Sequence, residues 1–245
     1  MKKYCKLFKA AYLFCIGAAF FACASSVPAQ QATVFGMVEF THTVNLLRDI
    51  PDPRMTMVFS LLEAGGNVKD IEFINKNLYQ GQSPAQYKDA VIQEWQTDYL
   101  ENREYAGSQD PLPAVFNWEY WEKMDFNLFK ERGMTVRREI YTYSGGAHGM
   151  GTVKYSVFDL ADKRVLKMDD FFRDDTVERL YSIVKSELLR YNNARGYAVL
   201  GEKEPLSQGI FFSDNPALTD NFFINKEGMG LNWEPYKIAH IPKAV

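Results

Sequence analysis

The sequence predicts an α+β domain in which an antiparallel β-meander sheet carries helices on one face. Residues 116–168 alternate apolar and polar side chains and are divided by turn signals, a pattern typical of consecutive antiparallel strands. Residues 68–103 and 175–191 instead repeat apolar side chains every three or four positions, which is typical of amphipathic helices. With 245 residues, 47% of them hydrophobic, the chain can bury one large core. We therefore expect a single α+β domain over residues 37–245.

The segment before this domain predicts targeting and attachment. Residues 1–22 combine a lysine-rich head with an uncharged apolar run too short to span a membrane, as a signal peptide does. Two cleavage sites fit: one before Cys23, whose thiol would then carry a lipid, and one after Ala29. All three cysteines lie at or before position 23, which favours a lipidated Cys23 and leaves the domain without disulfides. Small and polar residues at 23–36 predict a tether.

The charge balance argues against a nucleic-acid ligand. The chain carries 31 acidic and 28 basic residues, and four of the lysines belong to the signal peptide, so the secreted domain is acidic. An acidic domain is consistent with a basic partner. We expect secretion across the cytoplasmic membrane and lipid anchoring in the cell envelope, in the periplasm or on the outer surface.

The N-terminal half predicts two strands followed by two helices. Residues 37–45 and 55–63 have strand composition, although apolar side chains occur on both faces of the first. Residues 68–78 then repeat apolar side chains at helical spacing. Residues 83–86 form a capping box with proline at the first helical position, and this second helix should continue to about Arg103.

The meander contains two charged residues at positions that the pattern assigns to an apolar face. Even positions over residues 116–128 are apolar except for Glu122. Even positions over residues 134–140 are apolar except for Arg138. The alternation nevertheless predicts one buried face on each strand, and two further strands are expected before residue 168.

The C-terminal part predicts one more helix and a hairpin. Residues 175–191 place apolar side chains along one stripe, and we expect this helix to lie across the buried face of the sheet. Phe222–Ile224 and Leu231–Trp233 flank the turn Asn225–Gly228 and predict a terminal hairpin.

The candidate binding site is a glycine-rich loop between two predicted strands. Four glycines, two tyrosines and a histidine fall within residues 141–151, and glycine permits positive φ and close backbone approach. Ser144 lies between two strands rather than at the strand-to-helix elbow of a hydrolase. Loop structure, ligand contact and catalysis all stay open for Ser144 and His148. The candidate binding residues are Tyr141, Tyr143, Ser144, Gly145, Gly146, Ala147, His148 and Gly149.

No metal or cofactor is expected. The three histidines, His42, His148 and His240, lack metal-ligand spacing to one another. The acidic cluster at 169–175 lacks the alternating ligands and glycine of a calcium loop, and its aspartates should instead favour the positive N-terminus of the next helix. A carboxylate pair for glycoside hydrolysis stays open, because several acidic residues could share the sheet. These residues are Glu119, Glu122, Glu139 and Asp159.

Residues 141–149 resemble the Tyr-x-Tyr-Thr/Ser-Gly-Gly-Ala-His-Gly signature of a family of extracytoplasmic bacterial domains of unassigned function. The same domain forms the ectodomain of the anti-sigma-V factor RsiV, a lysozyme receptor. Two further stretches resemble this family in the same order: Asp159 with Leu166–Phe171, and the hairpin that begins at Phe222. The resemblance covers roughly residues 110–240.

The resemblance implies an α+β domain with a binding role rather than an enzymatic one, and in one branch the recognition of lysozyme. The chain departs from that branch, because its sequence contains no transmembrane helix and no cytoplasmic sigma-binding segment. The leading hypothesis is a lipid-anchored envelope protein that recognises lysozyme or a related wall-associated ligand. The alternatives are a peptidoglycan- or polysaccharide-acting hydrolase and a structural envelope domain of unknown ligand.

Overall fold

The computed structural model describes residues 32–47, 53–107, 114–130, 132–194, 200–215, 218–234 and 237, and residues 32–245 form one compact unit. Several sequence predictions lie outside the described residues: the signal peptide, Cys23, most of the tether and His240. Within the described ranges, no helix has both the length and the apolar character needed to cross a membrane.

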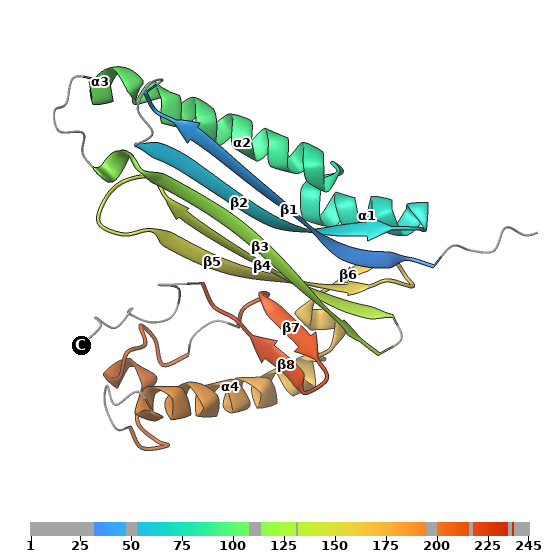
Figure 1. Ribbon diagram of the computed structural model, residues 1–245. Helices are drawn as coiled ribbons and strands as arrows, with labels where there is room; N and C mark the ends of the chain where they lie inside the picture. The colour runs from blue at the N-terminus through green and yellow to red at the C-terminus, as the bar shows by residue number, and fades with distance from the viewer. Residues whose placement is uncertain are drawn as a thin grey trace, which may run out of the picture. The chain divides into compact units, whose positions relative to one another are not determined.

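The centre of the fold is a six-stranded sheet whose spatial order follows the chain (Figure 1). The strands are β1 (Val34–Asn45), β2 (Arg54–Gly65), β3 (Trp118–Phe129), β4 (Gly133–Tyr143), β5 (Met150–Asp159) and β6 (Arg164–Leu166). All neighbours pair antiparallel except β2 and β3. The predicted α+β class and the antiparallel meander of the last four strands are therefore confirmed.

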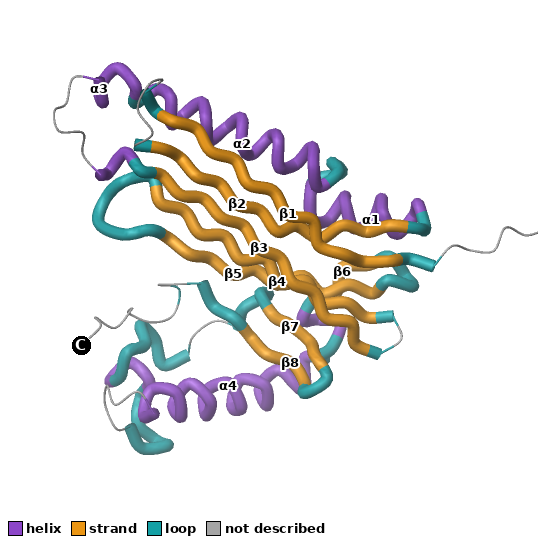
Figure 2. The backbone as a smooth tube through the Cα atoms, viewed as in Figure 1, coloured by secondary structure: helices purple, strands orange, loops and turns teal. Residues whose placement is uncertain are grey.

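The one parallel pair explains why helices cover one face of the sheet. Parallel neighbours need a crossover connection, because the chain must return to the starting end before the next strand begins. The crossover consists of α1 (Val68–Tyr79), α2 (Pro84–Glu101), the short α3 (Arg103–Gly107) and a 3-10 turn (Ala114–Phe116). Figure 2 shows α1 and α2 lying along one face of the sheet. The predicted capping box at Ser83 and Gln86 is confirmed, and it starts α2.

Strand β1 begins earlier than the sequence suggested. Val34–Gly36, which the composition assigns to the tether, pair with Glu63–Gly65 as part of the sheet. Val38, Phe40, His42 and Val44 are half-buried, whereas the side chains between them are exposed. The long pairing with β2 decides this start, because backbone hydrogen bonding can order residues whose side chains carry no strand signal.

The expected position of the last helix is wrong. Helix α4 (Asp174–Ala194) lies on the side of the sheet away from α1 and α2, with the hairpin of β7 (Phe222–Asn225) and β8 (Gly228–Leu231) (Figure 1). The crossover helices already fill the face that the sequence assigned to it. Leu180 packs instead with the small cluster of Val157, Met168 and Phe222. The second hairpin strand is also shorter than expected and leaves Trp233 outside it.

The main hydrophobic core lies between the sheet and the crossover helices. Fully buried side chains from β2, α1 and α2 meet there, including Phe59, Leu61, Ile74, Tyr79 and Tyr99. On β3 and β4 the even-numbered residues face this core, as the alternation predicted. The odd-numbered residues face the opposite side, where Thr135 Oγ1 donates a hydrogen bond to the Ile224 carbonyl of the hairpin (2.7 Å).

The two charged interruptions of the apolar face are partners inside this core. Glu122 is fully buried, and Arg138 Nε lies 2.8 Å from its Oε1 as an ion pair rather than an aligned hydrogen bond. Tyr120 and Tyr87 donate hydrogen bonds to Glu122 Oε2 at 2.7 and 3.0 Å. Arg138 Nη2 also donates to the Tyr87 hydroxyl. The cluster therefore joins β3, β4 and α2 through polar contacts within an apolar layer.

Titration behaviour reflects this burial. Burial, followed by the nearby Glu122 charge, raises the pKa of Tyr87 to about 12 and raises the pKa of Tyr120 still further. Burial by itself would lower the pKa of Arg138, but the Glu122 carboxylate outweighs it and the net pKa is raised. The phenols thus stay protonated as donors, and the guanidinium stays charged, across the physiological range.

We expect Arg138→Met to destabilise the fold by about 3–5 kcal/mol, because it leaves the Glu122 carboxylate buried without its cation. Chemical denaturation at neutral pH measures this loss. Arg137→Met is the matched control: the neighbouring arginine pairs with the partly exposed Glu139 and the exposed Asp125, so its loss should cost at most about 1 kcal/mol. The double variant Glu122→Met/Arg138→Met should recover much of the stability. Equal losses for the two single variants would contradict this account.

Candidate ligand-binding surface

The glycine-rich loop between β4 and β5 has a defined shape. Gly145 and Gly146 adopt φ of 94° and 100°, the left-handed region that side chains rarely adopt. The Tyr143 hydroxyl donates a hydrogen bond to the Gly146 carbonyl (3.1 Å). The His148 ring, with its hydrogen on Nδ1, donates to the Gly149 carbonyl (3.0 Å). The loop therefore holds its own backbone while most of the His148 side chain faces solvent.

An aromatic pair lies on the sheet directly beside this loop. Trp121 of β3 and Tyr141 of β4 are cross-strand partners, and their rings stack at 5.5 Å with 15° between the planes. Lys123 Nζ lies 5.2 Å from the centre of the Trp121 ring. Gly149 packs against Tyr141 so closely that a Cβ there would lie 2.3 Å from the ring. The loop and the pair therefore form one continuous unit.

This unit continues across the sheet on the face opposite the crossover helices. Val58 lies beside Trp121 in the register of β2 and β3, and Gly151 lies beside Tyr141 in that of β4 and β5. A groove of about 580 Å³ adjoins Trp121, lined by residues of β2 and β3 that include Thr56 and Glu119. The hairpin covers the other end of this face through Thr135 and leaves the loop end uncovered among the described residues. We call Trp121, Tyr141, the loop 143–149 and this groove the aromatic surface.

The predicted binding residues therefore lie together, but their exposure differs. Ser144, Gly146, Ala147 and His148 are exposed at the loop tip. Tyr141, Tyr143, Gly145 and Gly149 are half-buried and give the loop its shape. Sequence reasoning missed Trp121, because only the pairing of β3 with β4 brings it against Tyr141.

The four acidic residues considered for glycoside hydrolysis do not converge. Glu122 is buried under the crossover helices, whereas Glu139 pairs with Arg137 on the opposite face (2.6 Å). Glu119 is exposed on the aromatic surface, where it lines the groove. Asp159 lies opposite Gly133, at the end of β4 remote from the glycine-rich loop. Among the described residues, no group of three histidine or acidic side chains could hold a metal ion.

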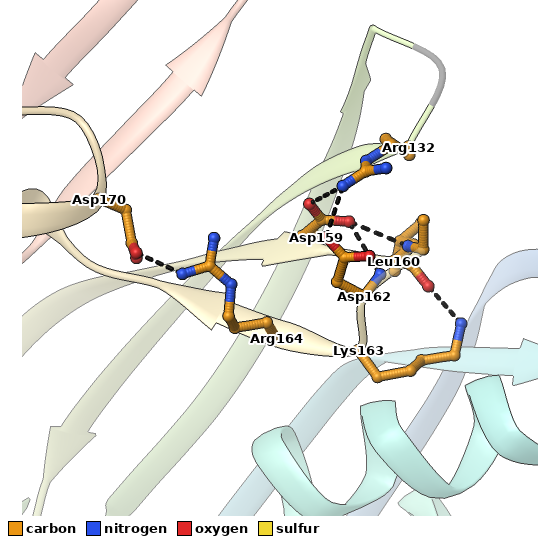
Figure 3. A network of polar contacts seen from close by, with 8 residues as sticks. Arg132, Asp159, Leu160, Asp162, Lys163, Arg164 and Asp170 are labelled. Carbon is orange, nitrogen blue, oxygen red and sulfur yellow. Dashed lines mark hydrogen bonds and ion pairs between the residues drawn. The ribbon is translucent and has the colours of Figure 1, made fainter.

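Asp159 instead stabilises the turn that joins β5 to β6 (Figure 3). Its carboxylate accepts hydrogen bonds from Arg132 Nη2 (2.7 Å) and from the backbone N–H groups of Ala161 and Asp162 (3.0 and 3.1 Å). These contacts, the Arg132 bond first, lower the pKa of Asp159. Asp170 of the acidic cluster acts similarly: it accepts from Lys167 N (2.7 Å), which lowers its pKa. Both aspartates therefore have structural roles.

Comparison with known proteins relates this chain to a family without an assigned function. Residues 169–244 match the family described as "Protein of unknown function (DUF3298)". A DUF3298 family member from Bacteroides fragilis NCTC 9343 has a similar crystal structure, with a TM-score of 0.68, 21% identity and coverage of 86% of this chain and 87% of the other. A DUF3298 family protein from Pseudomonas aeruginosa PAO1 has a TM-score of 0.52, 12% identity and 86% coverage of both chains. At these identities the likeness shows the fold. No curated protein matches the sequence.

We expect Gly149→Ala to displace the Tyr141 ring from Trp121, because the new Cβ would overlap it. The near-ultraviolet circular dichroism of the stacked rings should weaken, with a loss of about 0.5–1.5 kcal/mol in stability. Gly151→Ala is the control, because a Cβ there meets nothing within 4 Å. Unchanged spectra for Gly149→Ala would rule out the proposed support of the ring.

Asp159→Asn should lower stability at pH 6 by more than it does at pH 3. The folded-state pKa of Asp159 lies below the ordinary value of 3.8, so its stabilisation is present above that value and is lost as the pH falls through the folded pKa. Denaturation curves at the two pH values test this. Asp162→Asn keeps both backbone hydrogen bonds of the turn and should have a smaller effect at pH 6. If Asp159→Asn lowered stability as much at pH 3 as at pH 6, the stabilising role of the ionised Asp159 carboxylate would be contradicted.

Proposed function

We propose that this chain, whose residues 169–244 match the DUF3298 family of unknown function, is a lipid-anchored envelope protein that binds a macromolecule through the aromatic surface. The ligand that we favour is lysozyme or a related wall-associated enzyme. The observation that carries the proposal is the stacked pair of Trp121 and Tyr141 beside a loop that fixes its own shape.

Several properties of this surface support protein recognition. Tryptophan and tyrosine supply much of the binding energy at protein interfaces. The loop is ordered by its own hydrogen bonds, so its residues have less freedom to lose when a partner binds. The exposed tip residues Ser144 and His148 add hydrogen-bonding groups at the rim of the aromatic pair. We favour lysozyme as the ligand because residues 141–149 resemble the RsiV ectodomain signature.

Charge supports the same class of partner. The chain has more acidic than basic residues, and lysozymes of the hen type are basic, so electrostatic attraction would speed their encounter. A lipid on Cys23 would keep the domain at the membrane, where a wall-degrading enzyme arrives. The hydrolase alternative has less support, because the acidic residues that prompted it lie on different faces and ends of the sheet.

We expect residues 24–245 to bind hen-type lysozyme saturably in calorimetry, with lower affinity at physiological salt than at low salt. Trp121→Ala and Tyr141→Ala should each weaken binding more than about tenfold, as hot-spot residues do. Tyr181→Ala, which removes an exposed ring from α4, is the control and should bind normally.

Absence of binding by the unaltered domain at either salt concentration would remove lysozyme as the ligand. Normal binding by both aromatic-surface variants would move the binding site elsewhere. Loss of binding by Tyr181→Ala alone would place the site on α4.

A further inference from the structure

A second groove, of about 740 Å³, lies between β5 and the chain that surrounds the terminal hairpin. Its volume is within the range of ordinary small-molecule sites. Residues on its lining include Lys154, Tyr155, Phe212, Asp220, Trp233 and Glu234. None of the lining residues belongs to the aromatic surface, so the two can be tested separately.

Two asparagines hold the walls of this groove together. Asn221 Oδ1 accepts a hydrogen bond from Tyr155 N, and its Nδ2 donates to the Val153 carbonyl, both at 2.7 Å. Asn232 Nδ2 also donates to the Val153 carbonyl, at 3.0 Å. Strand β6 pairs only with Val157–Asp159, so these side chains cover the outer edge of β5 where no strand does. The groove is therefore formed before any ligand arrives.

The same asparagines exclude one kind of occupant. An extended peptide that added to the edge of β5 would need the Val153 carbonyl and the Tyr155 N–H. Both groups are already bonded to asparagine side chains. A ligand in this groove must therefore be recognised by the side chains that line it.

Those side chains combine aromatic rings with neutral polar groups and with equal numbers of positive and negative charges. Tyr155 is held against Phe223 (4.9 Å between ring centres), and Phe212 exposes 47% of its surface. Serine, threonine and asparagine side chains also line the groove. Two lysines and two acidic residues also line the groove, and they include a loose Lys237–Glu234 pair at 3.9 Å. The equal numbers of cationic and anionic groups disfavour a strongly charged ligand.

We infer that this groove binds a short uncharged saccharide. A pyranose ring presents C–H bonds on its faces, which pack against aromatic rings, and hydroxyl groups around its rim, which bond to carboxylates, amides and hydroxyls. Trp233 and Tyr155 supply the aromatic contacts in this site, whereas Asp220 and Glu234 accept hydrogen bonds from the sugar hydroxyls. Hydrogen bonds of this kind give selectivity, because a ligand without the hydroxyls leaves them unmade.

The test is titration of the full chain with N-acetylglucosamine trimer and, separately, with maltotriose. Tryptophan fluorescence and calorimetry measure the binding. We expect at least one trimer to bind with a millimolar or lower Kd. The two trimers distinguish an acetamido-bearing glycan from a plain glucan. Trp233→Ala and Asp220→Ala should each weaken binding about tenfold or more, and Asp220→Ala guards against a folding defect in the tryptophan variant.

Tyr105→Ala is the matched control, because it removes an exposed ring that does not line the groove. It should leave saccharide binding unchanged. Failure of both trimers to bind at millimolar concentration would overturn the inference. Equal affinity in the unaltered chain and both groove variants would do the same. Lysozyme binding can fail while saccharide binding persists, so this result and that of the proposed function are separable.

Discussion

The buried contact between Glu122 and Arg138 is the constraint on which the arrangement of the sheet depends. A charged pair inside an apolar layer is tolerated only when both members are present and hydrogen-bonded. Here Tyr87 brings α2 to the pair, so one cluster connects the crossover to two central strands. A register slip of one residue between β3 and β4 would turn one member to the other face and leave its partner buried alone. The cluster thus specifies the register of β3 with β4 as well as the contact of α2 with these strands.

The crossover has a second consequence for the opposite face of the sheet. Because α1 and α2 occupy one side, α4 and the hairpin can pack only on the other, where they cover one end of the strands (Figure 2). The end that the described residues leave uncovered carries Trp121 and Tyr141 next to the glycine-rich loop. The junction of the hairpin with β5 produces the separate groove beside Tyr155. Both proposed sites therefore lie beside the part of the sheet that α4 and the β7–β8 hairpin cover.

The two proposed sites differ in the kind of ligand that they suit. The aromatic surface belongs to a sheet and a self-bonded loop, which suits a large partner. The groove beside Tyr155 has walls fixed by Asn221 and Asn232, which suits a small polar ligand.

The sequence by itself determined the local elements. Period-two alternation placed the meander, the Ser83–Gln86 box placed the start of α2, and the glycines placed the loop, because each signal acts over a few neighbouring residues. It also marked Glu122 and Arg138 as exceptions, without showing that they were partners. Only the tertiary structure decided the parallel pairing of β2 with β3, the side taken by α4, and the meeting of Trp121 with Tyr141. These outcomes depend on which surfaces of the sheet the crossover helices leave free. The spacing of residues along the chain does not show which elements will pack on those surfaces.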